Sequence, residues 1–156
     1  MTFDPNAVRS IASESRASED GNETGGILLG HDSAGDLCVR RAGGPGPNAK
    51  RSPHRFLRDL QHARDLADHA YDVDGSIWLG EWHTHPQGPA TPSDLDLTTY
   101  SAHLSDTSLA FDRFLACIVL PRPEHQWTHV ILNAWIITPM AATLAEINVS
   151  PEEPDV

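Results

Sequence analysis

The sequence is poor in positive charge, in cysteine and in long apolar runs. Its 156 residues hold 11 lysines and arginines against 22 aspartates and glutamates, a formal net charge of −11 at pH 7. This balance excludes nucleic acid and anionic membranes as main partners, because both require a basic surface. No run approaches the ~20 apolar residues of a membrane span, and no export signal opens the chain. We therefore expect a cytoplasmic protein.

The two cysteines, Cys38 and Cys117, each lie in an apolar, strand-like run. We expect buried free thiols rather than a disulfide, and neither cysteine has a catalytic context. The length and the 39% content of hydrophobic residues suit one globular domain. We assign residues 1–149 to that domain and predict that the acidic tail at 150–156 is flexible.

Hydrophobic periodicity predicts a mixture of helices and strands without strict alternation. The expected helices are 5–18, 55–71 and 93–104, the strands 26–31, 37–42, 76–85, 114–120 and 130–138, and the longer loops 43–54 and 121–129. Elements in this order favour an α/β or α+β fold, in which one sheet packs against helices.

Two histidines stand two residues apart near the end of a predicted strand, in the stretch GEWHTHPQGPATPSDLD. Side chains at this spacing project from the same face, so His83 and His85 are about 7 Å apart along the strand. Two neutral imidazoles so placed can bind one divalent ion. Taken alone, the pair is also compatible with an ordinary exposed strand.

Ser93 and Asp96 follow, three residues apart, where the next helix begins. One interpretation is a capping box, in which Ser93 is the N-cap and Asp96 replaces the usual Glu or Gln. The other is functional, because the Asp96 carboxylate and the two imidazoles leave one position open on a tetrahedral zinc ion. Three protein ligands and a free position are typical of catalytic rather than structural zinc.

The segment HTHPQGPATPSDLD resembles the JAMM signature of JAB/MPN-domain metalloproteases: His-x-His, seven residues, then Ser-x-x-Asp. The family also carries a glutamate before a Gly-Leu-Leu-Gly-like run, and ETGGILLG supplies Glu23 at that place. The likeness covers most of the chain and is strongest to short prokaryotic JAB proteins. It implies a single domain with a mixed β-sheet flanked by helices, of cytidine-deaminase-like architecture.

The resemblance implies a role for each matching residue. His83, His85 and Asp96 would bind one catalytic zinc ion. Glu23 would act as general base and then as general acid, and Ser93 would help to stabilise the oxyanion. These roles agree with the general chemistry of zinc hydrolases. A different divalent metal is also compatible with these ligands.

Glu81 competes with Glu23, because it lies two residues before His83 and shares its face on a regular strand. It could act as base, as a fourth ligand or as a residue that orients a ligand imidazole. Trp78 and Trp82 alternate with the histidines and are expected in the core. Gly25, Gly26 and Gly30 surround a strand, where their expected role is to allow close backbone approach.

The resemblance implies hydrolysis of the amide bond after the tail of a ubiquitin-like protein, as in deubiquitinase-like isopeptidases. Bacterial relatives are associated with ubiquitin-like conjugation operons, including antiphage defence operons that encode E1- and E2-like partners. A catalytically silent MPN-type scaffold and a zinc hydrolase acting on a small amide are the alternatives.

Overall fold

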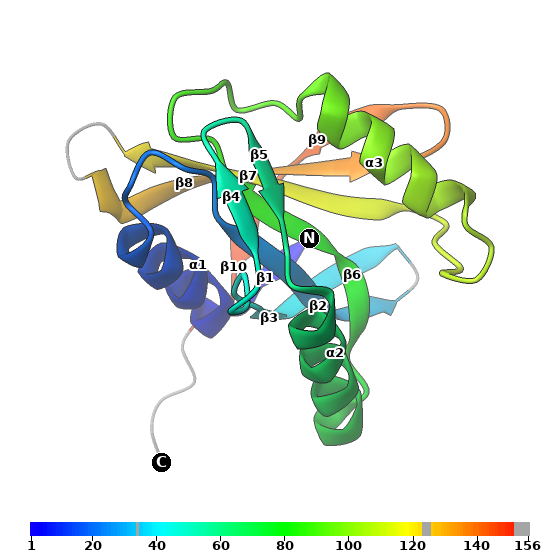
Figure 1. The fold of residues 1–156 in the computed structure, drawn as a ribbon. Coiled ribbons are helices and arrows are strands. Elements are labelled where there is room, and N and C mark those ends of the chain that lie inside the picture. The colour runs from blue at the N-terminus through cyan, green and yellow to red at the C-terminus, as the bar shows by residue number, and fades with distance from the viewer. Residues whose placement is uncertain (34, 123–125, 152–156) are drawn as a thin grey trace, which may run out of the picture.

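The computed structural model describes residues 1–33, 35–122 and 126–151. Within this set the chain forms one large mixed sheet, a separate hairpin and three helices (Figure 1). The elements are β1 (Thr2–Phe3), α1 (Pro5–Ala17), β2 (Gly25–Ser33), β3 (Asp36–Ala42), β4 (Lys50–Ser52), β5 (Arg55–Leu57), α2 (Leu60–Asp74), β6 (Ile77–Thr84), α3 (Asp94–Ser105), β7 (Phe114–Arg122), β8 (Gln126–Ile137), β9 (Ala142–Ala145) and β10 (Asn148–Val149).

The large sheet has the strand order β10-β1-β3-β2-β6-β7-β8-β9. β6 pairs in parallel with β7 and antiparallel with β2, so the strand that carries the histidines lies in the middle of the sheet. β4 and β5 pair only with each other among the described strands. The predicted fold class, a mixed sheet flanked by helices in one α+β unit, is confirmed.

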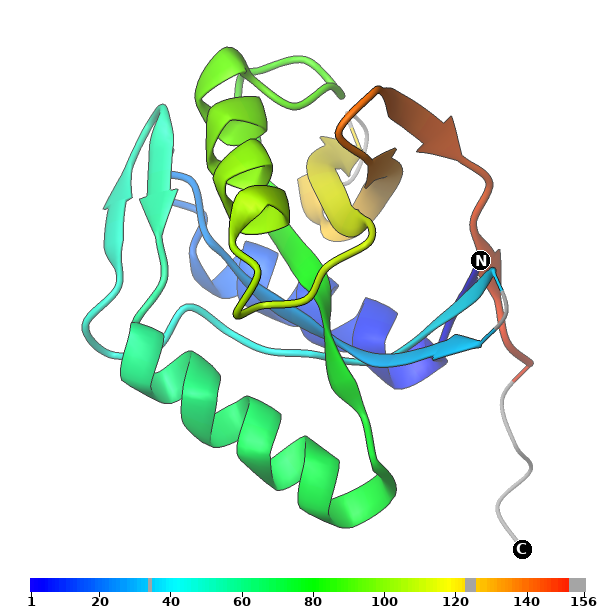
Figure 2. The same ribbon diagram turned by 90° about the vertical axis from the view of Figure 1, so that its right-hand side faces the viewer.

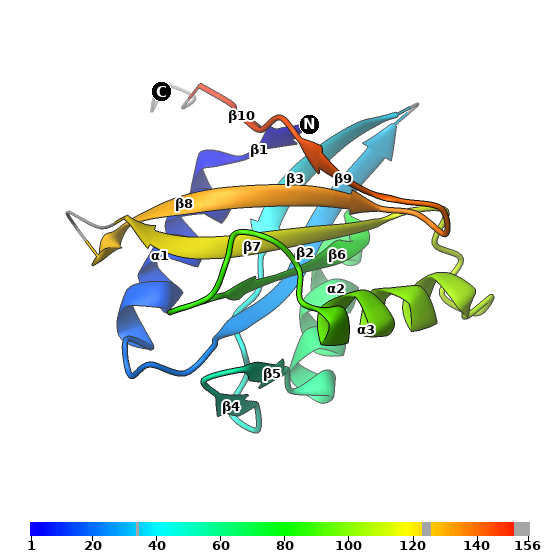
Figure 3. The same cartoon turned by 90° about the horizontal axis from the view of Figure 1, so that it is seen from above.

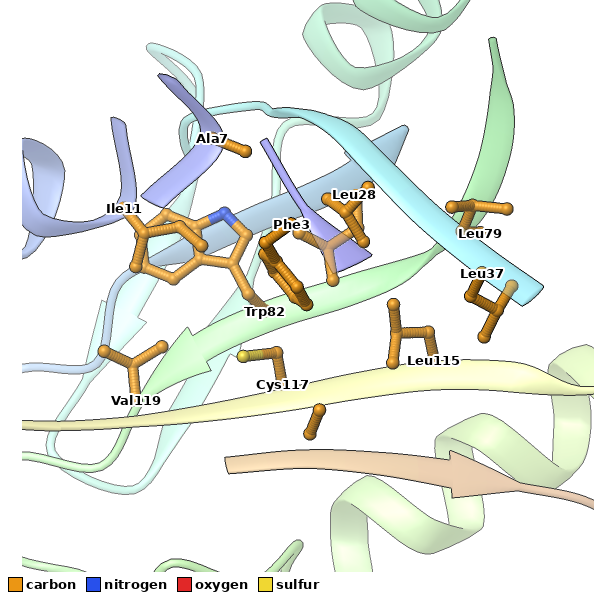
Figure 4. Close-up of a cluster of buried hydrophobic side chains, with 12 residues drawn as sticks. Phe3, Ala7, Ile11, Leu28, Leu37, Leu79, Trp82, Leu115, Cys117 and Val119 are labelled. Carbon is orange, nitrogen blue, oxygen red and sulfur yellow. The ribbon is translucent and has the colours of Figure 1, made fainter. Parts of the chain in front are cut away.

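Helix α1 covers one face of the sheet, and α2 and α3 pack on the other (Figures 1 and 2). The largest buried cluster joins Ala7 and Ile11 of α1 to Leu28, Trp82 and other apolar side chains of the sheet (Figure 4). These apolar contacts hold the central strands rigidly, which fixes the backbone that presents the histidines.

A β-bulge in β6 changes which face its side chains occupy. Leu28 pairs with Gly80 while Leu29 pairs with Trp78, so Leu79 is an extra residue in β6. Trp82 is buried against α1, as predicted, but Trp78 lies on the opposite face and contacts the clusters under α2 and α3. The expectation that both tryptophans alternate with the histidines was therefore wrong for Trp78.

The glycines around β2 allow close backbone approach, as predicted. A side chain on Gly25 would clash with the Trp82 carbonyl and would lie 2.8 Å from the His83 Cβ. A side chain on Gly26 would clash with the carbonyl oxygen of Gly43, and one on Gly30 with that of Cys38. The tight pairing of β2 with β6 therefore depends on glycine at the start of β2.

Three sequence predictions were wrong in part. The predicted helix 55–71 begins only at Leu60, because Asp59 caps it by accepting hydrogen bonds from the backbone N–H groups of Gln61 and His62. Residues 55–57 instead form β5, and the predicted loop 43–54 contains its partner β4. The predicted loop 121–129 is also shorter, since β7 continues to Arg122 and β8 starts at Gln126.

The C-terminal strands were not predicted. β9 extends the sheet beside β8, and β10 pairs in parallel with β1. Of the predicted flexible tail 150–156, residues 152–156 lie outside the described part of the chain, and the domain boundary after residue 149 stays a prediction. Both cysteines are free; Cys117 is buried and Cys38 only partly so. Among the described residues, no helix is long and apolar enough to cross a bilayer.

Candidate metal centre

Three side chains from the end of β6, the residue that follows it and the start of α3 converge at one point. His83 is near the end of that strand, His85 follows it, and Asp96 lies in the first turn of α3. Figure 3 shows the chain turning back after β6 to enter α3. Ligand atoms of His83, His85 and Asp96 all lie within 4.8 Å of one another, and both histidines are buried. The predicted ligand set is therefore brought together.

The spacing of these atoms fits a tetrahedral ion. The two histidine Nε2 atoms are 3.0 Å apart, and Asp96 Oδ2 lies 3.4 Å from that of His83 and 3.6 Å from that of His85. Ligand atoms bonded at about 2.0–2.1 Å to a tetrahedral zinc lie about 3.3–3.4 Å apart. Two nitrogens and one oxygen suit zinc, and the three residues leave one position for a non-protein ligand.

A backbone carbonyl determines which nitrogen of His85 can bind a metal. His85 Nδ1 lies 2.8 Å from the Pro89 carbonyl oxygen, which can only accept a hydrogen bond. Nδ1 must therefore carry the proton, and Nε2 presents its lone pair to the ligand cluster. The indole of Trp135 donates to the carbonyl of Ala90 at 3.0 Å, which holds the same loop against β8.

The charge distribution at the cluster also favours a cation. Burial opposes ionisation of Asp96, but hydrogen bonds from His83 and His85 hold the pKa of its carboxyl far below the ordinary value. Burial lowers the pKa of His85, whereas Asp96 and Pro89 raise it, and the net shift is upward. The pocket thus stabilises positive charge between these groups, which a divalent ion supplies.

Ser93 and Asp96 form the predicted capping box. The Ser93 Oγ accepts a hydrogen bond from the Asp96 backbone N–H, and the Asp96 carboxylate accepts from the Ser93 backbone N–H at 2.7 Å. The Ser93 hydroxyl also donates to Asp96 Oδ2 at 2.7 Å. The capping and metal-binding interpretations are therefore compatible, because the cap orients the same carboxylate that joins the histidines.

Substituting Ser93 separates its two roles. We expect Ser93→Ala to lower stability by about 1 kcal/mol through loss of the cap, and to lower turnover about a hundredfold if the hydroxyl stabilises the oxyanion. Ser93→Gly should destabilise by only a few tenths of a kcal/mol yet lose the same turnover. Thermal unfolding, zinc content and steady-state rates measure these effects. A glycine variant with wild-type turnover would leave Ser93 with the capping role alone.

Glu23 lies beside the cluster, two residues before β2. Its Oε1 is 4.0 Å from His85 Nε2, and the residue is 7% exposed. Burial raises the pKa of the Glu23 carboxyl, although the nearby histidines oppose that shift. The adjacent Thr24 exchanges hydrogen bonds with Thr84, the residue between the two histidines. The backbone that carries Glu23 is thereby fixed to the backbone that carries the ligands.

No sequence pattern pointed to Arg51, whose side chain contacts the backbone of Glu23. Its Nε donates to the Glu23 carbonyl at 3.0 Å, and its guanidinium forms a bidentate pair with Asp20. The Glu23 backbone N–H also donates to the carbonyl of Ser52, so both backbone groups of Glu23 bond to β4. Arg51 is therefore a positioning residue for Glu23.

Removing this arginine should misplace the carboxylate without removing a ligand. If Glu23 has the catalytic role that the family resemblance implies, Arg51→Ala should lower turnover tenfold to about a hundredfold, because small displacements of a catalytic group cost rates of this order. Arg51→Lys should lower turnover nearly as much as Arg51→Ala, since an ammonium group cannot replace the bidentate guanidinium. Arg41→Ala, which breaks a surface pair with Asp74, is the matched control. Loss of zinc in Arg51→Ala would contradict a role confined to Glu23.

Glu81 is occupied by a different partner. Its Oε2 lies 2.6 Å from the Arg58 Nη1, and the Arg58 guanidinium stacks over Trp78 at 5.1 Å from the ring centroid. Burial raises the pKa of Glu81 even though Arg58 opposes the shift. Among the described residues, Glu81 is outside the group whose ligand atoms converge. A role in orienting His83 stays a prediction.

Comparisons with a family model and with individual proteins indicate the same family. Residues 5–138 match the family described as prokaryotic homologues of the JAB domain. A protein of Enterobacter hormaechei named "CD-NTase/cGAS isopeptidase" is 36% identical over 101 residues, which cover 62% of this chain and 51% of the relative. A Pseudomonas aeruginosa protein of the same name is 30% identical over 103 residues, 65% of each chain. The chain spans about half to two thirds of these relatives.

Solved structures show the same fold. A solution structure of a protein from Desulfitobacterium hafniense superposes with a TM-score of 0.72 over 98% of this chain and 94% of that one, at 23% identity. A protein from Salinibacter ruber superposes with a TM-score of 0.60 over 99% and 94% of the two chains, at 26% identity. These similarities concern the arrangement of elements.

Proposed function

The chain belongs to the prokaryotic homologues of the JAB domain, and from this premise we propose that it is a zinc-dependent isopeptidase or peptidase. Its substrate would be the amide bond after the C-terminal tail of a ubiquitin-like protein. The observation that carries the proposal is the convergence of His83, His85 and Asp96, with the Glu23 carboxylate 4.0 Å from the His85 Nε2.

His83, His85 and Asp96 would hold the ion. When bound, zinc would supply Lewis acidity to the scissile carbonyl and favour ionisation of water near neutral pH. The Pro89 carbonyl keeps the lone pair of His85 Nε2 directed to the ligand cluster. The Ser93 backbone N–H keeps the Asp96 carboxylate in its ligand position.

Glu23 would carry the proton. Its buried carboxylate, whose pKa is raised, accepts a proton from the attacking water as the oxygen–carbon bond forms. It then donates that proton to the amine nitrogen as the carbon–nitrogen bond breaks. The Thr24–Thr84 hydrogen bonds and Arg51 fix its position during both transfers.

Ser93 would donate a hydrogen bond to the oxyanion. Its hydroxyl now donates to Asp96 Oδ2, so it must rotate toward the substrate oxygen for this step. Ser93 is exposed, so its hydroxyl is accessible to a substrate.

The substrate class rests on the relatives. Several relatives are named CD-NTase/cGAS isopeptidase. The first substrate to test is therefore a conjugate in which a ubiquitin-like tail is joined to a CD-NTase. Among the described strands β5 pairs only with β4, so its other edge, beside the site, could pair with an extended tail. Cytoplasmic location, E1- and E2-like partners and antiphage defence belong to the same proposal. A silent scaffold is less favoured because each residue of the motif is present.

A cleavage assay with the purified protein tests this function directly. We would incubate it with ubiquitin-like proteins whose Gly-Gly tails carry either a short peptide extension or an isopeptide-linked lysine, with and without chelator. Mass spectrometry should locate cleavage after the second glycine, abolished by chelator and restored by zinc. Intact substrates in the presence of zinc-loaded protein would favour a scaffold, and cleavage of small acyl amides alone would favour the small-amide alternative.

A further inference from the structure

A cavity of about 310 Å³ opens beside the ligands, between the β4–β5 hairpin and α3. Glu23, His83 and Asp96 form part of its wall, so a molecule bound there lies next to the reacting centre. Figure 2 shows the hairpin and α3 side by side over the same face of the sheet. The hairpin and the start of α2 provide the opposite wall.

Part of that wall is apolar and exposed. Leu57 of β5, Leu60 at the start of α2 and Leu95 of α3 line the cavity and are 44%, 60% and 47% exposed. They are three of only ten large hydrophobic side chains exposed among the described residues. Three leucines from three elements around one cavity are typical of a binding surface rather than of scattered surface residues.

The hairpin adds two unpaired cations. Lys50 lies directly across from Leu57 in the strand pairing, and Arg55 lies across from Ser52. Both cations are exposed and line the cavity, and no acidic partner contacts either within the described part of the chain. Alternate residues share a face of a strand, so Arg55 and Leu57 point to the same side.

The other charges of this region are already compensated. Arg51 pairs with Asp20, and Arg58 pairs with Glu81 inside the cavity wall. Of the remaining carboxylates of the cavity, Asp96 belongs to the ligand cluster, and Glu23 lies beside that cluster, 4.0 Å from His85 Nε2. The net unpaired charge on the hairpin wall is therefore positive, in a chain whose formal net charge is −11.

We propose, on the basis of the isopeptidase function above, that this cavity is a specificity subsite for a substrate segment in which carboxylate and bulky aliphatic side chains are neighbours. The carboxylates contact Lys50 and Arg55, and the aliphatic groups pack on Leu57, Leu60 and Leu95. An acidic chain repels acidic segments over most of its surface, so the local cations also direct such a segment to the cavity.

Binding can be measured without cleavage. Three fluorescein-labelled, product-like hexapeptides ending in Gly-Gly would be compared by fluorescence anisotropy: Leu-Glu-Leu-Glu, Leu-Lys-Leu-Lys and Leu-Ser-Leu-Ser before the two glycines. We expect the acidic peptide to bind the zinc-loaded chain about tenfold more tightly than the lysine peptide, with a preference that weakens as salt increases.

Charge reversal on the hairpin provides the decisive comparison. Lys50→Glu with Arg55→Glu should reverse the preference, whereas Arg16→Glu with Arg40→Glu changes the net charge equally at exposed positions outside the cavity and should preserve it. Leu57→Ser should weaken binding of all three peptides alike. Zinc content and thermal unfolding establish that each variant is folded.

Three results would contradict the proposed subsite. They are equal binding of the three peptides, undetectable binding of all three, and a charge preference that persists after the charge reversal on the hairpin. The results that contradict the proposed function are different from those that contradict the subsite. Charge-dependent binding without hydrolysis of any tail would contradict the isopeptidase but leave the subsite, and hydrolysis indifferent to charge would contradict only the subsite.

Discussion

Replacing His83 by alanine is expected to remove the metal and the activity together. The imidazole is buried and its Nε2 lies 3.0 Å from that of His85 and 3.4 Å from Asp96 Oδ2, so the substitution takes away one of three converging ligand atoms. Zinc per chain should fall to background. Turnover should fall about a thousandfold or more, since a catalytic metal contributes several kcal/mol.

Elemental analysis of dialysed protein and steady-state rates measure the two effects. The matched control is His69→Ala, which removes an exposed histidine of α2 and should leave one zinc per chain and full turnover. Full zinc content in His83→Ala would mean that the metal is bound elsewhere. Full turnover without zinc would mean that the chemistry does not depend on it.

Replacing Glu23 by glutamine is expected to abolish most of the activity while the metal stays bound. The carboxylate lies 4.0 Å from His85 Nε2 but outside the converging ligand group of the described residues, so its loss should leave zinc content unchanged. The amide has nearly the same shape but cannot take up the proton of water at neutral pH. Turnover should therefore fall by about 10² to 10⁴.

Glu19→Gln is the control for this variant, because it makes the same chemical change at an exposed position of the same loop. Zinc content, thermal unfolding and turnover would be measured for both. Loss of zinc from Glu23→Gln would reassign Glu23 as a ligand. Retained turnover would transfer the base role to another carboxylate, of which Glu81 is the nearest competitor in the cavity.

The parts of the site that depend on local geometry could be predicted from the sequence. His83 and His85 share a face because strand side chains alternate, and the Ser93–Asp96 capping box follows from three-residue spacing at a helix start. The observed α3 begins directly after Ser93, and the box is complete. The family resemblance added Glu23, whose distance from the histidines along the chain gives no local signal.

The parts that depend on distant pairing could not be predicted. β4 and β5 are three residues each in a segment rich in glycine and proline, so neither shows a recognisable period. Arg51 contacts Glu23 across 28 positions, and Lys50 and Leu57 become neighbours only through the hairpin register. The bulge that moves Trp78 to the face of Glu81 is likewise set by pairing with β2 rather than by the sequence of β6.

The central claim is that His83, His85 and Asp96 bind one ion together. An anomalous difference map at the zinc edge, from crystals of zinc-loaded protein, tests it most directly. The account predicts one peak at about 2.0–2.2 Å from His83 Nε2, His85 Nε2 and an Asp96 carboxylate oxygen. A peak elsewhere, or fully occupied zinc that lacks any of these three bonds, would contradict it.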